Sequence, residues 1–235
     1  MTEQTSAPTP LGTHLLEVYH RMYTRYGAQH WWPSEGPFET IIGAILTQNT
    51  AWGNVDRALN NLKRAGALNI ESIRDLPQDV LAGLIRPSGY YNSKAKKLKA
   101  FVDHMAEHHA NDLDAFLSQE LVPLRLELLS IYGIGEETAD DILVYAAGLP
   151  SFVIDTYTKR ILRRLGQAPD TDRYATHQAL FHENLRPDTP LFNEFHALFD
   201  RHAKDTCRRV PLCRDCCLMQ LCATGTSWLA NQEGL

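Results

Sequence analysis

Residues 131–139 read IYGIGEETA, and this short stretch decides the fold. Apolar residues recur at helical spacing before it, over residues 124–130, and again after it, from Thr138 onward. The pattern therefore predicts a helix, a glycine hairpin and a second helix. Two glycines around one apolar residue allow a tight turn and let backbone N–H groups approach an anion. Because the second helix begins at the turn, its positive end would face the same anion, such as a phosphate oxygen.

A second motif follows that helix, where residues 151–157 read SFVIDTY. Its apolar run brings Asp155 to the position just before the next predicted helix. An isolated aspartate at such a position is most often an N-cap, and an isolated Gly-x-Gly between helices is often only a turn. Taken one at a time, both motifs therefore have a structural explanation beside the functional one.

The two motifs together resemble the helix-hairpin-helix and catalytic-aspartate signature of the endonuclease III superfamily of DNA glycosylases. The resemblance extends over residues 30–222. It implies that the partner is double-stranded DNA containing a damaged base. It also implies that Asp155 is the catalytic carboxylate and that the hairpin binds the DNA backbone through Gly133, Ile134, Gly135 and Thr138.

Helical periodicity extends over nearly the whole chain, and no stretch shows strand alternation, so we expect an all-α protein. One such helix is predicted over residues 94–109, with Asn92 as its N-cap. The resemblance implies two helical lobes: a barrel over residues 38–157 that contains the hairpin, and a second lobe made of residues 11–37 and 158–235. The polar, Pro- and Thr-rich residues 1–10 are expected to be a disordered lead-in.

All five cysteines lie between Cys207 and Cys222, which favours a metal site over a disulfide framework in a reducing compartment. Four thiolates in one loop can hold an iron–sulfur cubane or a zinc ion. The arrangement resembles the C-terminal [4Fe–4S] loop of the endonuclease III family, whose spacing is Cys-x6-Cys-x2-Cys-x5-Cys. The first gap is one residue shorter here. The resemblance implies that Cys217 is spare and that the ligands are Cys207, Cys213, Cys216 and Cys222, with zinc as the alternative metal.

The composition is that of an ordinary globular chain of 235 residues, with a formal net charge of −5. This acidic balance argues against indiscriminate nucleic-acid binding, although it leaves room for a local basic face. No apolar run has the length of a membrane span and the N-terminus lacks the apolar core of a signal peptide, so we expect an intracellular protein that does not act at a membrane. The resemblance implies a monomer that is cytoplasmic and associated with the nucleoid, or otherwise intracellular. Two groups of basic residues could form the basic face: Arg86, Lys94, Lys96, Lys97 and Lys99, and Lys159, Arg160, Arg163 and Arg164.

One departure from the family pattern concerns the chemistry. Bifunctional members carry a lysine in the second half of the hairpin motif, where this chain has Glu137. A carboxylate cannot form the imine through which such a lysine cuts the strand. We therefore predict a monofunctional glycosylase, in which water is the nucleophile and Asp155 stabilises an oxocarbenium-like sugar.

The segments around Trp31-Trp32-Pro33, residues 43–50 and Glu137 resemble one branch of the family, the 3-methyladenine DNA glycosylase III group. The resemblance implies that Trp31 and Trp52 form the walls of a base pocket and that Glu137 is its acid. Attached 3-methyladenine is cationic, so aromatic faces attract it and an acidic pocket does not repel it. The alternatives are an enzyme for oxidised or mismatched pyrimidines, such as thymine glycol or uracil, and a catalytically weak damaged-DNA-binding protein.

Two further segments resemble parts of the family that contact DNA. Gln48 resembles the residue that relatives insert into the gap left by the flipped nucleotide. The glycine turn over residues 88–95 resembles a DNA-contacting segment and contributes Lys94 to the expected interface. Either Tyr90 or Tyr91 could wedge into the duplex, and the sequence does not choose between them.

Overall fold

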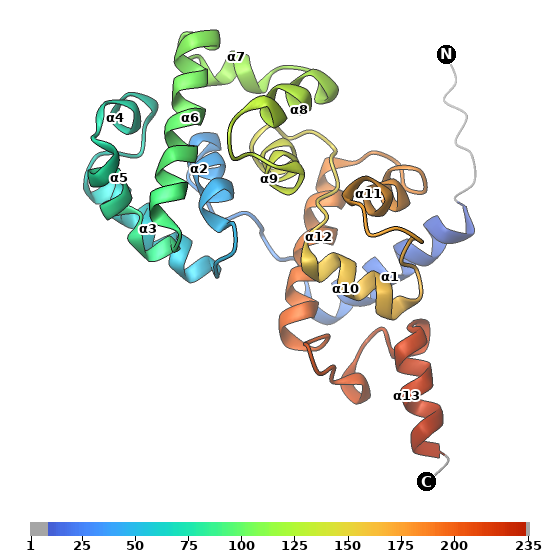
Figure 1. The fold of residues 1–235 in the computed structure, drawn as a ribbon. Helices are drawn as coiled ribbons and strands as arrows, with labels where there is room; N and C mark the ends of the chain where they lie inside the picture. Colours follow the sequence, from blue (N-terminus) through green and yellow to red (C-terminus); the bar gives the residue numbers. More distant parts are fainter. Residues whose placement is uncertain (1–8, 234–235) are drawn as a thin grey trace, which may run out of the picture. The chain divides into compact units, whose positions relative to one another are not determined.

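The computed structural model describes residues 9–233, and within that range the regular secondary structure is entirely helical (Figure 1). The expectation of an all-α protein is confirmed. Residues 1–8, the greater part of the expected lead-in, lie outside the described residues. The assignment of residues 9 and 10 to that lead-in is wrong, because α1 (Pro10–Tyr26) begins with proline and is capped by Thr9, whose hydroxyl accepts the Gly12 N–H at 2.9 Å.

The chain divides into two compact units, of which unit 2 comprises residues 32–151. Its centre is α2 (Pro37–Thr47), which is apolar nearly all round and has residues 39–46 buried. Around α2 pack α3, α6, α9 and the π-helical turn η2. The remaining elements of the unit are α3 (Trp52–Arg64), α4 (Ile70–Asp75), α5 (Gln78–Leu84), η1 (Arg86–Ser88), α6 (Tyr91–His109), α7 (Leu113–Leu117), α8 (Leu121–Ser130), α9 (Glu136–Asp141) and η2 (Ile142–Ala146).

Unit 1 comprises residues 9–31 and 152–233 of the described chain. Its core contains five phenylalanines, among which the ring of Phe152 contacts the other four. Phe152 and Phe181 stack face to face with ring centroids 3.5 Å apart. The elements of unit 1 are α1, α10 (Thr156–Leu165), α11 (Tyr174–His182), α12 (Thr189–Asp205), η3 (Cys213–Asp215), η4 (Met219–Leu221) and α13 (Ala223–Glu233).

The limits of the two units follow from where two aromatic residues pack. Trp32 packs on Trp52 and Tyr145, so the chain joins unit 2 at residue 32, ahead of the expected residue 38. Phe152 is buried among the phenylalanines of unit 1, so the chain leaves unit 2 after residue 151, ahead of the expected residue 157. Asp155 therefore belongs to unit 1.

Helix α6 begins at Tyr91, three residues before the expected start, with Tyr90 in the left-handed region at its N-cap position and no side-chain cap. The prediction of an Asn92 cap is therefore wrong, since Asn92 lies within the first turn.

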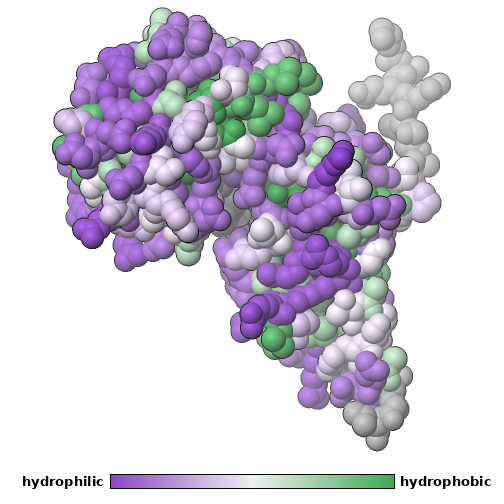
Figure 2. Space-filling view, in the orientation of Figure 1, coloured by the Kyte–Doolittle hydropathy of each residue, from purple (hydrophilic) through white to green (hydrophobic). Residues whose placement is uncertain are grey.

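The face seen in Figure 2 is mostly hydrophilic, but an apolar group of side chains lies over α8, where Val122 and Leu126 are exposed. Among residues 9–233, none of the helices has both the length and the apolar character needed to cross a bilayer.

Candidate nucleic-acid interface and catalytic residues

The predicted hairpin joins α8 to α9 in unit 2. Gly133 has φ +89°, and a Cβ added there would come within 2.3 Å of Lys97 Cγ, so the turn needs glycine at this position. Gly135 has φ −98°, and a Cβ added there would have no atom within 4 Å. The first glycine therefore shapes the turn, while the second leaves the backbone open to an approaching ligand.

The other two hairpin residues point inward. The side chains of Ile134 and Thr138 are 5% exposed, and the Ile134 N–H donates to the Ile131 carbonyl at 3.1 Å. Their burial supports the turn from inside. The role of Thr138 at DNA stays a prediction.

Gln48 is held by the hairpin instead of extending away from it. Its Nε2 donates to the Gly133 carbonyl at 3.0 Å and to the Thr138 hydroxyl at 2.9 Å, and its Oε1 accepts from the Lys97 ammonium. Both ends of the amide are thus engaged, so insertion into DNA would first break these hydrogen bonds. The sequence did not indicate that Lys97 brings a positive charge to the hairpin.

The expectation that Lys94 contacts DNA is wrong, because its side chain is 1% exposed. Its ammonium donates to the carbonyl of Leu46 at 2.8 Å and to that of Ser88 at 2.7 Å. Lys94 therefore joins the end of α2 to η1 inside unit 2. Burial, with the neighbouring charge of Lys97, lowers the pKa of Lys94 to about 8.

We expect the free energy of unfolding to rise with pH between about 8 and 10.5 because of Lys94, by up to about 3 kcal/mol. Over this range the unfolded chain keeps the lysine proton and the folded chain has lost it, so raising the pH favours the folded state. A neutral amine still has the two N–H groups that the two carbonyls need. Urea unfolding of wild type and Lys94→Met across this range measures the difference, and parallel pH curves would contradict the assignment.

The two tyrosines of the second glycine turn differ in exposure. Tyr90 is 73% exposed and has φ +43°, in the left-handed region. Tyr91 is partly buried against the core of unit 2, and the Arg86 guanidinium lies 5.9 Å from its ring centroid. Of the two, Tyr90 is the one whose ring is presented to solvent.

The aromatic residues expected in a base pocket belong to different units. In unit 2, Trp52 packs edge-to-face on Trp32 at 4.9 Å, and Trp32 lies against Tyr145 of η2 at 5.1 Å. In unit 1, the Lys204 ammonium lies 5.9 Å from the Trp31 ring centroid. The structure thus adds Trp32 and Tyr145 as neighbours of Trp52, and a pairing of Trp31 with Trp52 stays a prediction.

The two acids of α9's first turn are both exposed. Glu136 Oε1 lies 4.0 Å from Arg125 Nη2 of α8. Glu137 follows Glu136 directly, close to Gly135, at the end of α9 where the helix dipole is positive. An acid rather than an amine is therefore presented at this position.

Asp155 is the N-cap of α10, with its Oδ1 accepting the Thr158 N–H at 2.6 Å. Its Oδ2 lies 4.0 Å from Nε2 of His196 on α12, and the carboxylate side chain is 17% exposed. Burial lowers the pKa of His196, although the charge of Asp155 opposes this. The cap and the partial burial together hold the carboxylate in one orientation. Asp155 is therefore the N-cap that its position before a predicted helix suggested, and its carboxylate is still partly exposed to a ligand.

Four of the five cysteines line one cavity in unit 1, and Cys217 instead lines a separate depression beside α1. The thiols are not paired as disulfides. Burial raises the pKa of Cys213, and it raises that of Cys216 to about 12, in each case with nearby cysteine thiolates adding to the effect. The cavity is lined by Cys207, Cys213, Cys216 and Cys222 together with Ile161, Leu165, Leu218 and other residues.

The donor set of this cavity fits a bound metal group. Crowded thiolates repel each other in an apolar site, and a cationic centre removes that cost. Arg164 supports the loop, since its Nη1 lies 3.1 Å from Cys207 Sγ and it donates to the carbonyls of residues 207, 208 and 209. Within the described chain no three of the cysteine sulfurs lie within 4.8 Å of one another. A single zinc ion would hold its sulfur ligands about 3.8 Å apart, so these sulfurs are spaced more widely than one zinc ion requires.

Sequence comparison finds similar proteins among DNA repair enzymes. A Methanocaldococcus jannaschii protein whose name assigns it to DNA repair glycosylases is 43% identical over 209 residues, covering 88% of this chain and 95% of that protein. Endonuclease III of Sulfolobus acidocaldarius is 29% identical over 187 residues, covering 79% of this chain and 81% of its own.

Solved structures and a family match agree with this. Helicobacter pylori 3-methyladenine DNA glycosylase, solved with 1,N6-ethenoadenine, has a TM-score of 0.69 at 28% identity, covering 81% of this chain and 97% of that chain. The endonuclease III chain of a non-covalent complex with DNA has a TM-score of 0.80 at 19% identity, covering 93% of this chain and 98% of that chain. This likeness shows a shared fold. Residues 42–187, well over half of the chain, match the HhH-GPD superfamily. The chain therefore belongs to the HhH-GPD superfamily of base excision DNA repair proteins.

Proposed function

We propose that the protein is a monofunctional DNA glycosylase that removes alkylated purines such as 3-methyladenine from double-stranded DNA. The observation that carries this proposal is Glu137, an exposed acid in the first turn of α9, where a strand-cutting enzyme would need an amine. The likeness to the H. pylori 3-methyladenine DNA glycosylase supports the substrate class.

In the proposed reaction Asp155 acts on the sugar. As the bond between C1′ and the base breaks, its electron pair leaves with the base and the sugar becomes oxocarbenium-like. The Asp155 carboxylate, oriented by the Thr158 N–H, stabilises that positive charge and orients the water that adds to C1′. The water oxygen forms the new bond to C1′, and its proton passes to the Asp155 carboxylate and from there to solvent. Because the alkylated base is already cationic, it departs as a neutral molecule and needs no strong general acid.

Binding of the lesion would use aromatic faces and an acid. A cationic base over a desolvated indole gains about 1–2 kcal/mol from cation–π attraction. Trp52, held by Trp32, and Trp31 are the proposed aromatic walls, with Glu137 as the acid. The hairpin backbone at Gly133 and Gly135 would bind phosphate, and the exposed Tyr90 is the proposed wedge into the duplex. We expect the protein to bind DNA as a monomer.

The test is release of free base from methylated duplex DNA, with strand breaks scored before and after alkali. We expect 3-methyladenine release by the wild type, with breaks only after alkali. Glu137→Gln should release it several-fold more slowly, because the cationic base loses an opposite charge, and the neighbouring Glu136→Gln is the matched control.

The same assay with other duplexes tests which base is removed, and the timing of the strand breaks tests whether the enzyme itself cuts the strand. Release from thymine glycol or uracil duplexes without release from methylated DNA would replace the alkylpurine assignment with the pyrimidine one. Breaks that form before alkali would contradict the monofunctional reaction. Binding to an abasic duplex without any release would favour a damaged-DNA-binding protein.

We also propose that Cys207, Cys213, Cys216 and Cys222 hold a [4Fe–4S] cluster in unit 1. Their shared cavity and the separate position of Cys217 support this ligand set. When bound, the cluster would supply structural support by joining the loop after α12 to the start of α13.

Two cysteine variants should therefore behave differently. Cys213→Ser is expected to lose the brown colour and most of the iron, because a thiolate ligand is missing. Cys217→Ser is expected to keep about four irons per chain, as the wild type does. Iron analysis and the absorption spectrum measure both. Equal iron loss in the two variants would contradict the ligand set, and zinc in a colourless wild-type protein would favour the alternative metal.

A further inference from the structure

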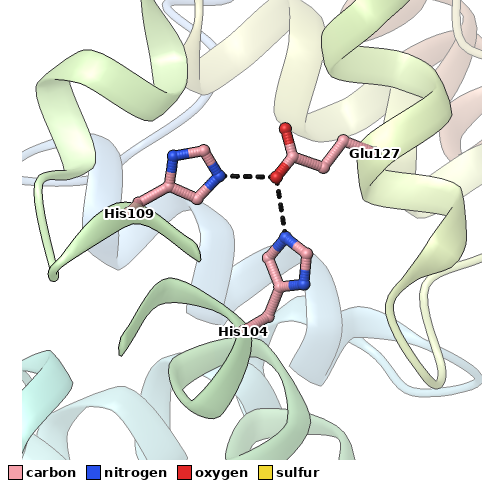
Figure 3. A group of neighbouring side chains, drawn as sticks. All are labelled: His104, His109 and Glu127. Atoms are coloured by element: carbon pink, nitrogen blue, oxygen red, sulfur yellow. Dashed lines mark hydrogen bonds and ion pairs between the residues drawn. The ribbon is translucent and has the colours of Figure 1, made fainter. Parts of the chain in front are cut away.

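A group of three metal-ligating side chains lies in unit 2, apart from the cysteine loop. His104 and His109, near the end of α6, direct their Nε2 atoms at one oxygen of Glu127 on α8 (Figure 3). The distances from Glu127 Oε1 are 2.8 Å to His104 and 2.5 Å to His109. All three ligand atoms lie within 4.8 Å of one another.

The surroundings hold these side chains in place. Gln119 donates to the other carboxylate oxygen, Oε2, at 2.8 Å, which leaves Oε1 facing the two imidazoles. The fully buried Phe116 packs edge-on against His109 at 4.9 Å and His104 at 6.5 Å. The three side chains are 15–22% exposed, so they are ordered by packing and still reachable from solvent.

We propose that His104, His109 and Glu127 form a binding site for a divalent transition-metal ion of the zinc class. Neutral imidazole nitrogens and a carboxylate oxygen are ligands that zinc takes, and three of them leave a fourth position for water. The carboxyl end of α6 carries the negative end of a long helix dipole, which favours a cation there. Gln119 would act as the outer partner that orients the carboxylate.

The ion would tie α6 to α8, the helix that leads into the hairpin at Ile131. It would displace the hydrogen bonds between the imidazoles and the carboxylate without any change in covalent structure. The site neither includes Glu137 or Asp155 nor depends on the proposed base excision. It is therefore a candidate for structural support of the helix before the hairpin, separate from the cluster proposed for the cysteine loop.

The experiment is calorimetric titration with zinc chloride of the full chain as purified, with any group bound to the cysteine loop left in place. The zinc-loaded protein is then examined by X-ray absorption at the zinc edge. We expect one equivalent to bind with only nitrogen and oxygen neighbours at about 2.0–2.1 Å, and no sulfur at about 2.3 Å. The melting temperature should rise with zinc, because the ion binds the folded chain.

Matched variants assign the ligands. Glu127→Gln keeps the shape and removes the anionic ligand, so the Kd should rise at least about ten-fold. Glu107→Gln changes an exposed acid on α6, the helix that carries the two histidines, and should bind like the wild type. If Glu127→Gln does not fold, His109→Asn takes its place with the same expectation. The proposal is overturned if the wild type binds no zinc, if zinc has sulfur neighbours, or if the ligand variants bind as the wild type does.

Discussion

Asp155→Asn is expected to slow base release by at least about 100-fold while leaving the stability almost unchanged. The amide cannot stabilise the developing positive charge as a carboxylate does. Asparagine is as good an N-cap as aspartate, so its side-chain oxygen can still accept the Thr158 N–H. Single-turnover base release from methylated duplex DNA measures the rate, and thermal unfolding measures the stability.

Two further variants separate the catalytic role of Asp155 from its role as N-cap. Asp155→Ser also keeps a capping oxygen and should be equally inactive, whereas Asp155→Ala should lose about 1 kcal/mol of stability in addition. Retention of near-wild-type activity in Asp155→Asn, in a protein shown to bind DNA, would refute the catalytic role and leave only the N-cap.

Phe152→Ala is expected to lower the free energy of unfolding by about 3–5 kcal/mol. The ring is fully buried, stacks on Phe181 at 3.5 Å, and makes edge contacts with Phe192, Phe195 and Phe199. Its removal would leave a cavity that these rigid rings cannot readily fill. Urea unfolding followed by circular dichroism measures the loss.

The position of Phe152, three residues before Asp155, extends the consequence to activity. A loosened apolar run would move the carboxylate, so base release should fall even where the variant remains folded. Phe152→Leu, which keeps most of the volume, should lose less than half as much stability. A loss below about 1 kcal/mol in Phe152→Ala would show that the stacked rings do not hold unit 1 together.

The sequence by itself determined the helical class, the glycine hairpin and the place of Asp155 before α10. These features depend on neighbours within a few residues, through apolar periodicity, turn chemistry and capping, so they can be read locally. The clustering of cysteines over residues 207–222 is local in the same way. It predicted a metal site, whereas the choice of Cys217 as the spare cysteine rested on the resemblance to the family spacing and stays a prediction.

Only the tertiary structure decided which side chains face inward and which elements meet. Lys94 is buried because the end of α2 and η1 both present carbonyls to it, and the sequence pattern indicated only a basic helix. Gln48 is engaged because the hairpin, some 85 residues away, folds against it. The meeting of His104 and His109 with Glu127 likewise requires α8 to pack beside the end of α6. Such contacts join residues far apart in the chain, so they depend on the packing of whole helices and leave no local pattern in the sequence.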